Sequence, residues 1–124
     1  MEMKLELVPL PVSDVDRAKA FYVEQVGFTL DHDVRPSATM RVVQLTPPGS
    51  ACSIVIGTGM HDTPPGSVQG LHLVVADIRA TRDALASRGV AMGELVEYPG
   101  GIKYAAFSDP DGNGWTLQEM PPHA

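Results

Sequence analysis

The stretch LPVSDVDRAK at residues 10–19 is similar to a second stretch, LVVADIRATR, at residues 73–82. The two stretches lie 63 positions apart, and the same offset carries TPPGS at 46–50 onto DPDGN at 109–113. Because two separate motifs agree on one offset, the chain contains an internal repeat. The repeat decides the fold, since each copy must supply the same order of helices and strands.

Each half of the chain predicts one strand, one helix and three further strands. Ser13 or Asp14 can cap the first helix and Asp77 the second, because their side chains accept hydrogen bonds from the first backbone N–H groups. Gly27 and Gly89 then end the helices. The predicted helices cover 14–25 and 77–88, and the predicted strands cover 5–12, 28–33, 40–45, 52–57, 71–75, 90–97, 103–107 and 115–120.

The repeat divides the chain into two βαβββ modules. Module one covers residues 1–58, module two covers residues 70–122, and a linker rich in Gly, Pro, Ser and Thr joins them at 59–69. Neither module can bury both a helix face and a sheet face alone, so we expect a single domain over residues 1–124. The expected architecture is α+β, with helices on one side of a cup-shaped mixed sheet.

Composition narrows the possible partners. The chain has 124 residues, 44% of them hydrophobic, and a net charge of −6 without a basic stripe, so nucleic acid and anionic membranes are poor partners. No apolar run is long enough to span a membrane, and acids and prolines interrupt the region where a secretory signal would be apolar. Cys52 is the single cysteine and cannot form a disulfide framework. We therefore expect a cytoplasmic protein.

The motifs resemble those of the vicinal oxygen chelate superfamily, which includes glyoxalase I, extradiol dioxygenases, fosfomycin-resistance enzymes and bleomycin-resistance proteins. VSDVDRAKAFY at 12–22, ADI at 76–78 and FSDPDGN at 107–113 carry the resemblance, which covers nearly the whole chain. It implies a glyoxalase-like fold, a small-molecule ligand and a homodimer. It does not define a reaction, because one fold can serve many chemistries.

The resemblance also implies where a metal would bind. Metal-dependent members carry His, Glu or Gln on the first and last strand of each module, and here those positions hold Leu7, Ser53, Gly70 and Thr116. A divalent ion needs three or four strong donors, such as imidazole or carboxylate groups. No metal is therefore expected at the usual site. A divalent metal could bind only at a non-standard site made by His72, Gln118 and one further histidine.

Strand alternation predicts which side chains face the cup. His72 lies two residues after Gly70, and Gln118 lies two after Thr116, so both should point inward as the polar end of a ligand cavity. Glu119 has the opposite parity and is expected to be an exposed or rim charge. Trp115 shares that outward parity and should pack under the helices as core.

The other predicted ligand-binding residues also follow from the repeat. Arg41 and Tyr104 correspond at offset 63 and are expected to share the concave side. At the same offset His72 and Gln118 correspond to Pro9 and Val55, which would confine the polar pair to module two. The predicted ligand-binding set comprises His72, Gln118, Arg41, Tyr104, Ser53, Thr116, Leu7 and Val55, with Leu5, Leu7 and Val55 as its apolar side.

The sequence leaves the function open among three classes. The first is a small-molecule-binding protein of the bleomycin-resistance kind that works without the usual metal. The second is a glyoxalase-type lyase or isomerase acting on a vicinal dioxygen substrate, with His72 as the candidate general base. The third is a non-catalytic regulatory or assembly subunit. For His72 itself, a hydrogen-bonded structural imidazole and a ligand-orienting group are further interpretations.

Overall fold

The computed structural model describes residues 1–121, so residue 122, the end of predicted module two, and His123 lie outside the described residues. The elements of module one are β1 (Leu7–Pro9), α1 (Val15–Ala20), the π-helix η1 (Phe21–Val26), β2 (Thr29–Ser37), β3 (Met40–Thr46) and β4 (Ser53–Thr58). Those of module two are β5 (Leu71–Val74), α2 (Ile78–Ser87), β6 (Val96–Glu97), β7 (Lys103–Ser108) and β8 (Gly114–Glu119). This order confirms the predicted α+β class with two βαβββ modules.

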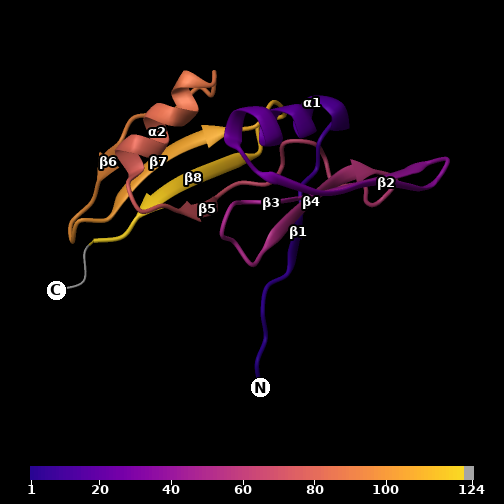
Figure 1. The fold of residues 1–124 in the computed structure, drawn as a ribbon, viewed down its shortest axis with the longest axis horizontal. Coiled ribbons are helices and arrows are strands. Elements are labelled where there is room, and N and C mark those ends of the chain that lie inside the picture. The colour runs from indigo at the N-terminus through magenta and orange to yellow at the C-terminus, as the bar shows by residue number, and fades with distance from the viewer. Residues whose placement is uncertain (122–124) are drawn as a thin grey trace.

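Each module forms its own four-stranded mixed sheet. The strand orders are β1-β4-β3-β2 and β5-β8-β7-β6, with β1 parallel to β4 and β5 parallel to β8. Helices α1 and α2 lie on the same side of the two sheets, and the other side is uncovered (Figure 1). We call that uncovered side the open face. No helix within residues 1–121 is long and apolar enough to cross a membrane.

Both helices begin and end where the sequence signals predict. The Asp14 carboxylate accepts a hydrogen bond from the backbone N–H of Arg17, and that of Asp77 accepts one from Ala80, each at 3.1 Å. The first helix widens into the π-helical turn η1 and stops at Gly27, whose φ of 92° lies in the left-handed region.

Two predicted strands are much shorter than expected. The first predicted strand, 5–12, shrinks to β1, although backbone hydrogen bonds to β4 continue on both sides of it, at Glu6 and at Leu10. The predicted strand 90–97 shrinks to β6, and the segment before it makes one backbone hydrogen bond to β7, from Gly93 to the Ala106 carbonyl at 2.8 Å. This irregular segment matters below because it lines a cavity.

One hydrophobic cluster joins the two modules. Alternate residues of the strands point toward the helices, and Tyr22 of η1 packs between Phe28 of module one and Trp115 of module two, with ring centroids 5.3 and 5.8 Å away. The predicted core residue Trp115 is buried in this cluster, together with Leu117 and Phe107.

Hydrogen bonds connect module one to the 109–113 turn of module two and to Trp115, which follows that turn. The Tyr22 hydroxyl donates to Asp109, the Trp115 indole donates to Tyr22, and the Asn113 amide donates to the Pro11 carbonyl, each at 2.8 Å. Burial, together with the negative charge of Asp109, raises the pKa of Tyr22 far above its usual range. The hydroxyl therefore stays protonated as the donor, and the turn both closes β7–β8 and joins the modules.

Candidate functional site

Strand register defines the residues of the open face. In module one Leu7 pairs with Ser53, and in module two His72 pairs with Thr116. Paired and alternate residues share a face, so the open face carries Leu7, Gln44, Thr46, Ser53, Val55, His72, Tyr104, Ala106, Thr116 and Gln118. Their neighbours along the strands, including Ile54 and Leu117, are in the core.

The register corrects one assignment made from the repeat. Spacing from the helix cap had placed Gly70 at the first-strand position of module two, but Gly70 precedes β5 and has a φ of 80°. The residue opposite Thr116 is His72, just as Leu7 stands opposite Ser53. The counterpart of His72 is therefore Leu7 rather than Pro9, because the connection from the first strand to the helix is two residues shorter in module two.

Arg41 was predicted on the concave side, and this prediction is wrong. Its guanidinium lies on the helix side of β3, bonded to Asp33 of β2 at 2.9 and 3.0 Å and to Asp16 of α1 at 2.8 Å. Eight residues separate paired Leu45 and Ile54, whereas eleven separate the equivalent pair in module two, Ala105 and Leu117. The two separations differ by three residues, and an odd difference moves a residue to the opposite face of its strand. The counterpart of Tyr104 in module one is therefore Gln44 rather than Arg41.

Arg41 instead belongs to an ion-pair network that joins the β2–β3 hairpin to α1. Lys19 of α1 also binds Asp33, with 2.7 Å between its Nζ and Oδ2. Arg41 is 8% exposed, so the bidentate contact with Asp33 is largely protected from water. We conclude that Arg41 has a structural role.

We expect the protein to lose stability in acid, and part of that loss to come from Asp33. Hydrogen bonds from Arg41 and Lys19 hold the pKa of the Asp33 carboxyl well below its usual range. A carboxyl with a lowered folded-state pKa stabilises the fold above its unfolded pKa of about 3.9, and this contribution is lost as the pH falls toward the folded-state pKa. Asp33→Asn should therefore unfold at lower urea concentration at neutral pH and lose less stability on acidification than the natural chain.

Urea unfolding at a series of pH values measures both effects. Asp16→Asn is the matched control, because the Asp16 side chain is 82% exposed and its contact with Arg41 is weakened by solvent. An acid-induced loss in Asp33→Asn as steep as in the natural chain would contradict the assignment.

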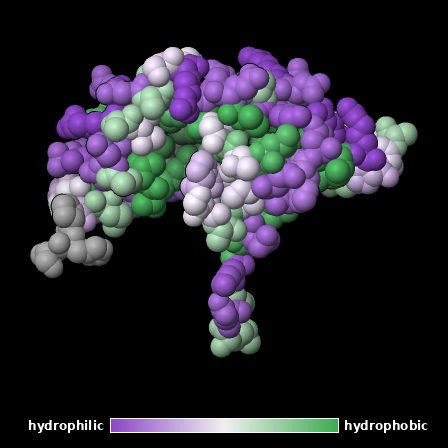
Figure 2. Space-filling view, in the orientation of Figure 1, coloured by the Kyte–Doolittle hydropathy of each residue, from purple (hydrophilic) through white to green (hydrophobic). Residues whose placement is uncertain are grey.

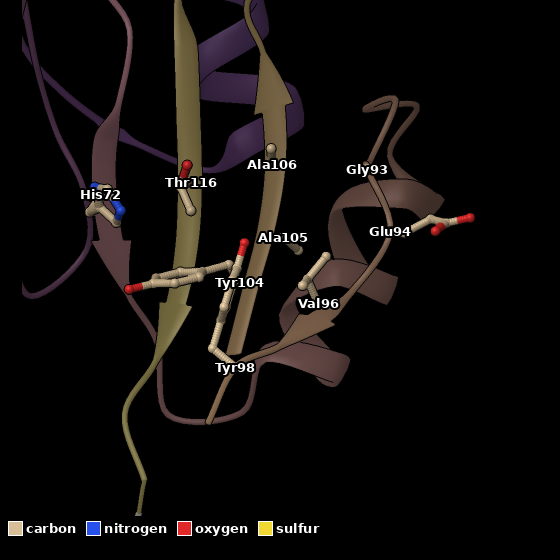
Figure 3. A pocket seen from close by; sticks show the side chains of 9 residues that line it. All are labelled: His72, Gly93, Glu94, Val96, Tyr98, Tyr104, Ala105, Ala106 and Thr116. Carbon is tan, nitrogen blue, oxygen red and sulfur yellow. The ribbon is translucent and has the colours of Figure 1, made fainter. Parts of the chain in front are cut away.

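The open face of module two holds a cavity of ≈ 560 Å³. Its walls come from β5, β6, β7 and β8, from the irregular segment before β6 and from Tyr98 after it (Figure 3). The side chain of Glu94 extends away from the other lining side chains in Figure 3, so the cavity wall is mainly aromatic and apolar. The lining residues are His72, Gly93, Glu94, Val96, Tyr98, Tyr104, Ala105, Ala106 and Thr116.

Three aromatic rings form one side of this cavity. Tyr104 lies edge-to-face with His72, with 5.8 Å between ring centroids, and with Tyr98, with 5.3 Å between centroids. Such rings offer flat apolar area together with hydroxyl and imidazole groups at the edges. Tyr98 and Val96 were not among the predicted site residues, and Tyr98 lies one residue beyond the predicted strand 90–97. A tyrosine beside the Pro-Gly-Gly turn at 99–101 was the signal that could have found Tyr98.

His72 has a defined hydrogen-bonding state in this geometry. Its Nδ1 lies 2.9 Å from the carbonyl oxygen of Gly70. A carbonyl oxygen only accepts, so Nδ1 is the donor in this contact, and in the neutral form of the ring Nε2 is then an acceptor. His72 can therefore orient a hydrogen-bond donor on a ligand or accept a proton from one.

The structure brings together some of the predicted site residues and separates others. His72, Tyr104 and Thr116 line the 560 Å³ cavity. Ser53 does not, but it lines a crevice of ≈ 270 Å³ between the modules that also contains His72 and Leu5. Gln118 is on the open face beside Tyr104, but it lines neither space and its amide lies 2.9 Å from the Met120 sulfur. Leu7 and Val55 also lie on the open face outside both linings.

Glu119 points to the helix side, as its parity predicts, but it is not an exposed charge. It accepts a hydrogen bond from the backbone N–H of Ile78 at 2.9 Å and pairs with Lys103 at 3.3 Å. The Ile78 hydrogen bond is the main cause that lowers the pKa of Glu119, and Lys103 adds to it. Glu119 thus supports the first turn of α2 rather than the site.

The donor set does not fit a divalent metal at the usual superfamily position. The four side chains that the register brings to that position are Leu7, Ser53, His72 and Thr116. They supply one imidazole and two neutral hydroxyls, which is fewer strong donors than a divalent ion requires. Within residues 1–121, no three His, Cys, Asp or Glu side chains gather as a metal-binding group.

The fold and site together define a paired-module α+β protein with an aromatic cavity on its open face. The family model for the Glyoxalase/Bleomycin resistance protein/Dioxygenase superfamily matches residues 4–117, and the chain belongs to this superfamily. The resemblance seen in the sequence is thereby confirmed. The curated proteins contain no match to the chain.

Solved structures of similar proteins agree with this placement. TnmS3, an antibiotic binding protein from Streptomyces sp. CB03234, is 40% identical with a TM-score of 0.85, and the match covers 97% of this chain and 98% of that chain. A glyoxalase/bleomycin resistance protein from the same organism is 42% identical, with a TM-score of 0.79 and coverages of 92% and 98%. A superfamily member from Sphaerobacter thermophilus DSM 20745 is 31% identical, with a TM-score of 0.85 and coverages of 96% and 98%.

Proposed function

We propose that the protein binds and sequesters an amphipathic small molecule with an aromatic or conjugated ring system, without the usual metal. The observation that carries this proposal is the 560 Å³ cavity, whose size suits a small molecule and whose wall combines Tyr98, Tyr104 and His72. The similarity to TnmS3, an antibiotic binding protein, supports an antibiotic as the kind of ligand. We place this activity in the cytoplasm.

The working form in this proposal is a homodimer whose second copy covers the open face. Four apolar side chains of that face are 43–69% exposed, namely Val34, Val74, Val96 and Tyr98. Exposed apolar surface of this kind is common where proteins associate. A second copy would remove it from water and enclose the cavity. Sedimentation velocity measures the mass, and a monomer at every concentration tested would exclude this form.

The function is tested by ligand-induced thermal stabilisation. A compound that binds only the folded state raises the melting temperature, and bleomycin and daunorubicin are suitable first members of a panel of amphipathic aromatic antibiotics. At least one member should stabilise the chain at micromolar to millimolar concentration. Absence of stabilisation across the panel, with the chain folded, would favour the third class, a regulatory or assembly subunit.

Replacement of His72 by alanine should weaken such a ligand. Loss of one neutral hydrogen bond costs about 0.5 to 1.5 kcal/mol, which raises Kd about two- to tenfold. Isothermal titration calorimetry on a stabilising compound measures the change. His61→Ala is the control, because His61 lines neither the cavity nor the crevice. Equal affinity of the natural chain and His72→Ala would remove His72 from the site.

A second candidate is a glyoxalase-type lyase or isomerase, which the Nε2 acceptor of His72 at the cavity favours. In that case His72 would take a proton from the carbon next to a carbonyl group of a vicinal dioxygen substrate. Turnover of a thiohemiacetal of methylglyoxal, lost in His72→Ala and retained in His61→Ala, would identify this activity. Binding without turnover leaves the sequestering function.

A further inference from the structure

A second group of polar side chains occupies the open face of module one, where Ser53 and Arg41 were the polar residues predicted from the sequence. Thr46 of β3 donates to the Asp31 carboxylate of β2, and its Oγ1 lies 2.6 Å from the Ser53 hydroxyl of β4. The Gln44 amide lies 3.5 Å from the same Ser53 oxygen. We call Asp31, Gln44, Thr46 and Ser53 the module-one polar cluster.

The position of Asp31 depends on an irregularity in β2. The pairing of β2 with β3 shifts register between Leu30, which pairs with Leu45 on the helix side, and His32, which pairs with Gln44 on the open face. The extra residue is Asp31, and its contact with Thr46 places its carboxylate on the open face. A bulge of this kind re-aims a side chain, and bulges are common next to functional sites.

The direction of the hydrogen bonds in the cluster follows from its chemistry. A carboxylate only accepts, so the single hydroxyl proton of Thr46 goes to Asp31. Ser53 must then donate its own proton to Thr46, and Gln44 must present its NH2 group to the Ser53 oxygen. Both hydroxyl protons are therefore used inside the cluster. What the cluster offers to a ligand is mainly acceptor oxygens.

The charge on Asp31 is not neutralised within the part of the chain that the structure describes. Asp31 takes part in no ion pair among residues 1–121, whereas Asp33, two positions along the same strand, holds both Arg41 and Lys19 on the opposite face. Oδ1 of Asp31 makes no hydrogen bond within that range, since its contact with Thr46 uses Oδ2. An acceptor of this charge is complementary to a cationic donor.

Ser53 connects the cluster to the aromatic cavity of module two, whereas Asp31, Gln44 and Thr46 line neither the crevice nor the cavity. Ser53 of the cluster and His72 line the same crevice between the modules, and His72 also lines the 560 Å³ cavity. Figure 2 shows hydrophobic surface in the hollow between the two modules. A ligand whose ring system lies against Tyr98 and Tyr104 can therefore extend past His72 toward Ser53.

We infer that the module-one polar cluster binds a protonated amine carried by the ligand, with Asp31 as its ionic contact. This inference rests on the proposed function, because it specifies which amphipathic molecules the site prefers: aromatic compounds with an ammonium group. Neutral compounds lack the charge, and carboxylates meet the Asp31 carboxylate with the same sign. The cluster thus determines specificity, while the aromatic cavity supplies most of the apolar contact.

The test uses three compounds with one ring system, namely naphthylmethylamine, naphthylmethanol and naphthylacetic acid. Each is titrated at neutral pH into the isotopically labelled full chain while backbone amide signals are followed by NMR. The amine should bind more tightly than the alcohol and the acid, and it should shift the amide signals of Asp31, Gln44, Thr46 and Ser53. Because Asp31 is exposed to solvent, Asp31→Asn should raise the Kd of the amine about two- to fivefold and leave that of the alcohol unchanged.

Asp62→Asn is the matched control, because it removes the same charge from the linker and should leave the preference for the amine intact. Thr46→Val provides a second variant that keeps the Asp31 charge but removes the hydroxyl relay, and it should weaken amine binding less than Asp31→Asn. Equal binding of the three compounds at the aromatic cavity, or an amine Kd unchanged in Asp31→Asn, would overturn the inference and leave the proposed function standing. If none of the three shifts any signal of the cavity residues, the proposed function fails and the inference fails with it.

Discussion

A fragment of residues 1–66 is expected to be unfolded or aggregated, although it contains a complete βαβββ module. The cut removes Trp115 and Phe107, which pack against the aromatic residues of η1. It also removes Asp109 and Asn113, the hydrogen-bond partners of Tyr22 and of the Pro11 carbonyl. The fragment would expose a large apolar face to water and lose these hydrogen bonds between the modules, each worth about 0.5 to 1.5 kcal/mol.

Circular dichroism and amide NMR dispersion on the fragment measure this outcome. The full chain under the same conditions is the positive control, and addition of a fragment of residues 67–124 should restore dispersed signals. We propose on these grounds that the two modules fold as one cooperative domain. A sharp thermal transition of the isolated fragment as a monomer would show instead that each module is independently stable.

Trp115→Ala is expected to lower the free energy of unfolding by about 3 to 5 kcal/mol, as for other large aromatic residues in cores. Trp115 is 3% exposed and lies within ring-packing distance of three residues, with centroids 5.6 Å from Phe28, 5.8 Å from Tyr22 and 6.2 Å from Phe107. Its indole N–H also donates to the Tyr22 hydroxyl. The substitution therefore removes packing and a buried hydrogen bond at the contact between modules.

Urea unfolding gives the free-energy change. Trp115→Phe is the graded control, because it keeps an aromatic ring and loses the N–H donor together with part of the volume, so a smaller loss of about 1 to 3 kcal/mol is expected. Tyr98→Ala on the half-exposed wall of the cavity should change stability less than either core substitution. A loss below about 1 kcal/mol in Trp115→Ala would mean that the core between the modules is not the main source of stability.

The helices and the module order could be read from the sequence because their signals are local. Asp14 and Asp77 cap helices through bonds to residues three positions away, and Gly27 ends a helix through its own backbone conformation. Strand lengths were less predictable, since a strand persists only where a neighbour pairs with it. The residues of the stretch 90–95 are compatible with a strand, but the stretch makes only one backbone hydrogen bond to β7, from Gly93, and so it does not form one.

For the site residues that were placed through the repeat, an even error in the offset left the predicted strand face unchanged and an odd error reversed it. Leu7 and His72 differ by 65 positions instead of 63, and a shift of two keeps His72 on the face that the repeat predicts. Gln44 and Tyr104 differ by 60, and a shift of three moves Arg41 to the helix side and brings Gln44 to the open face.

The sequence by itself determined the α+β class, the two βαβββ modules, the helix limits and the absence of strong chelating donors at Ser53 and Thr116. Only the tertiary structure decided the faces of β2 and β3, the ion pairs of Arg41, and the cluster that joins Asp31 to Ser53. The physical reason is that a helix is stabilised by contacts between residues close in the sequence, whereas a strand acquires its register and its bulges from pairing with a neighbour. Which side chains meet on the open face therefore depends on the paired sheet as a whole.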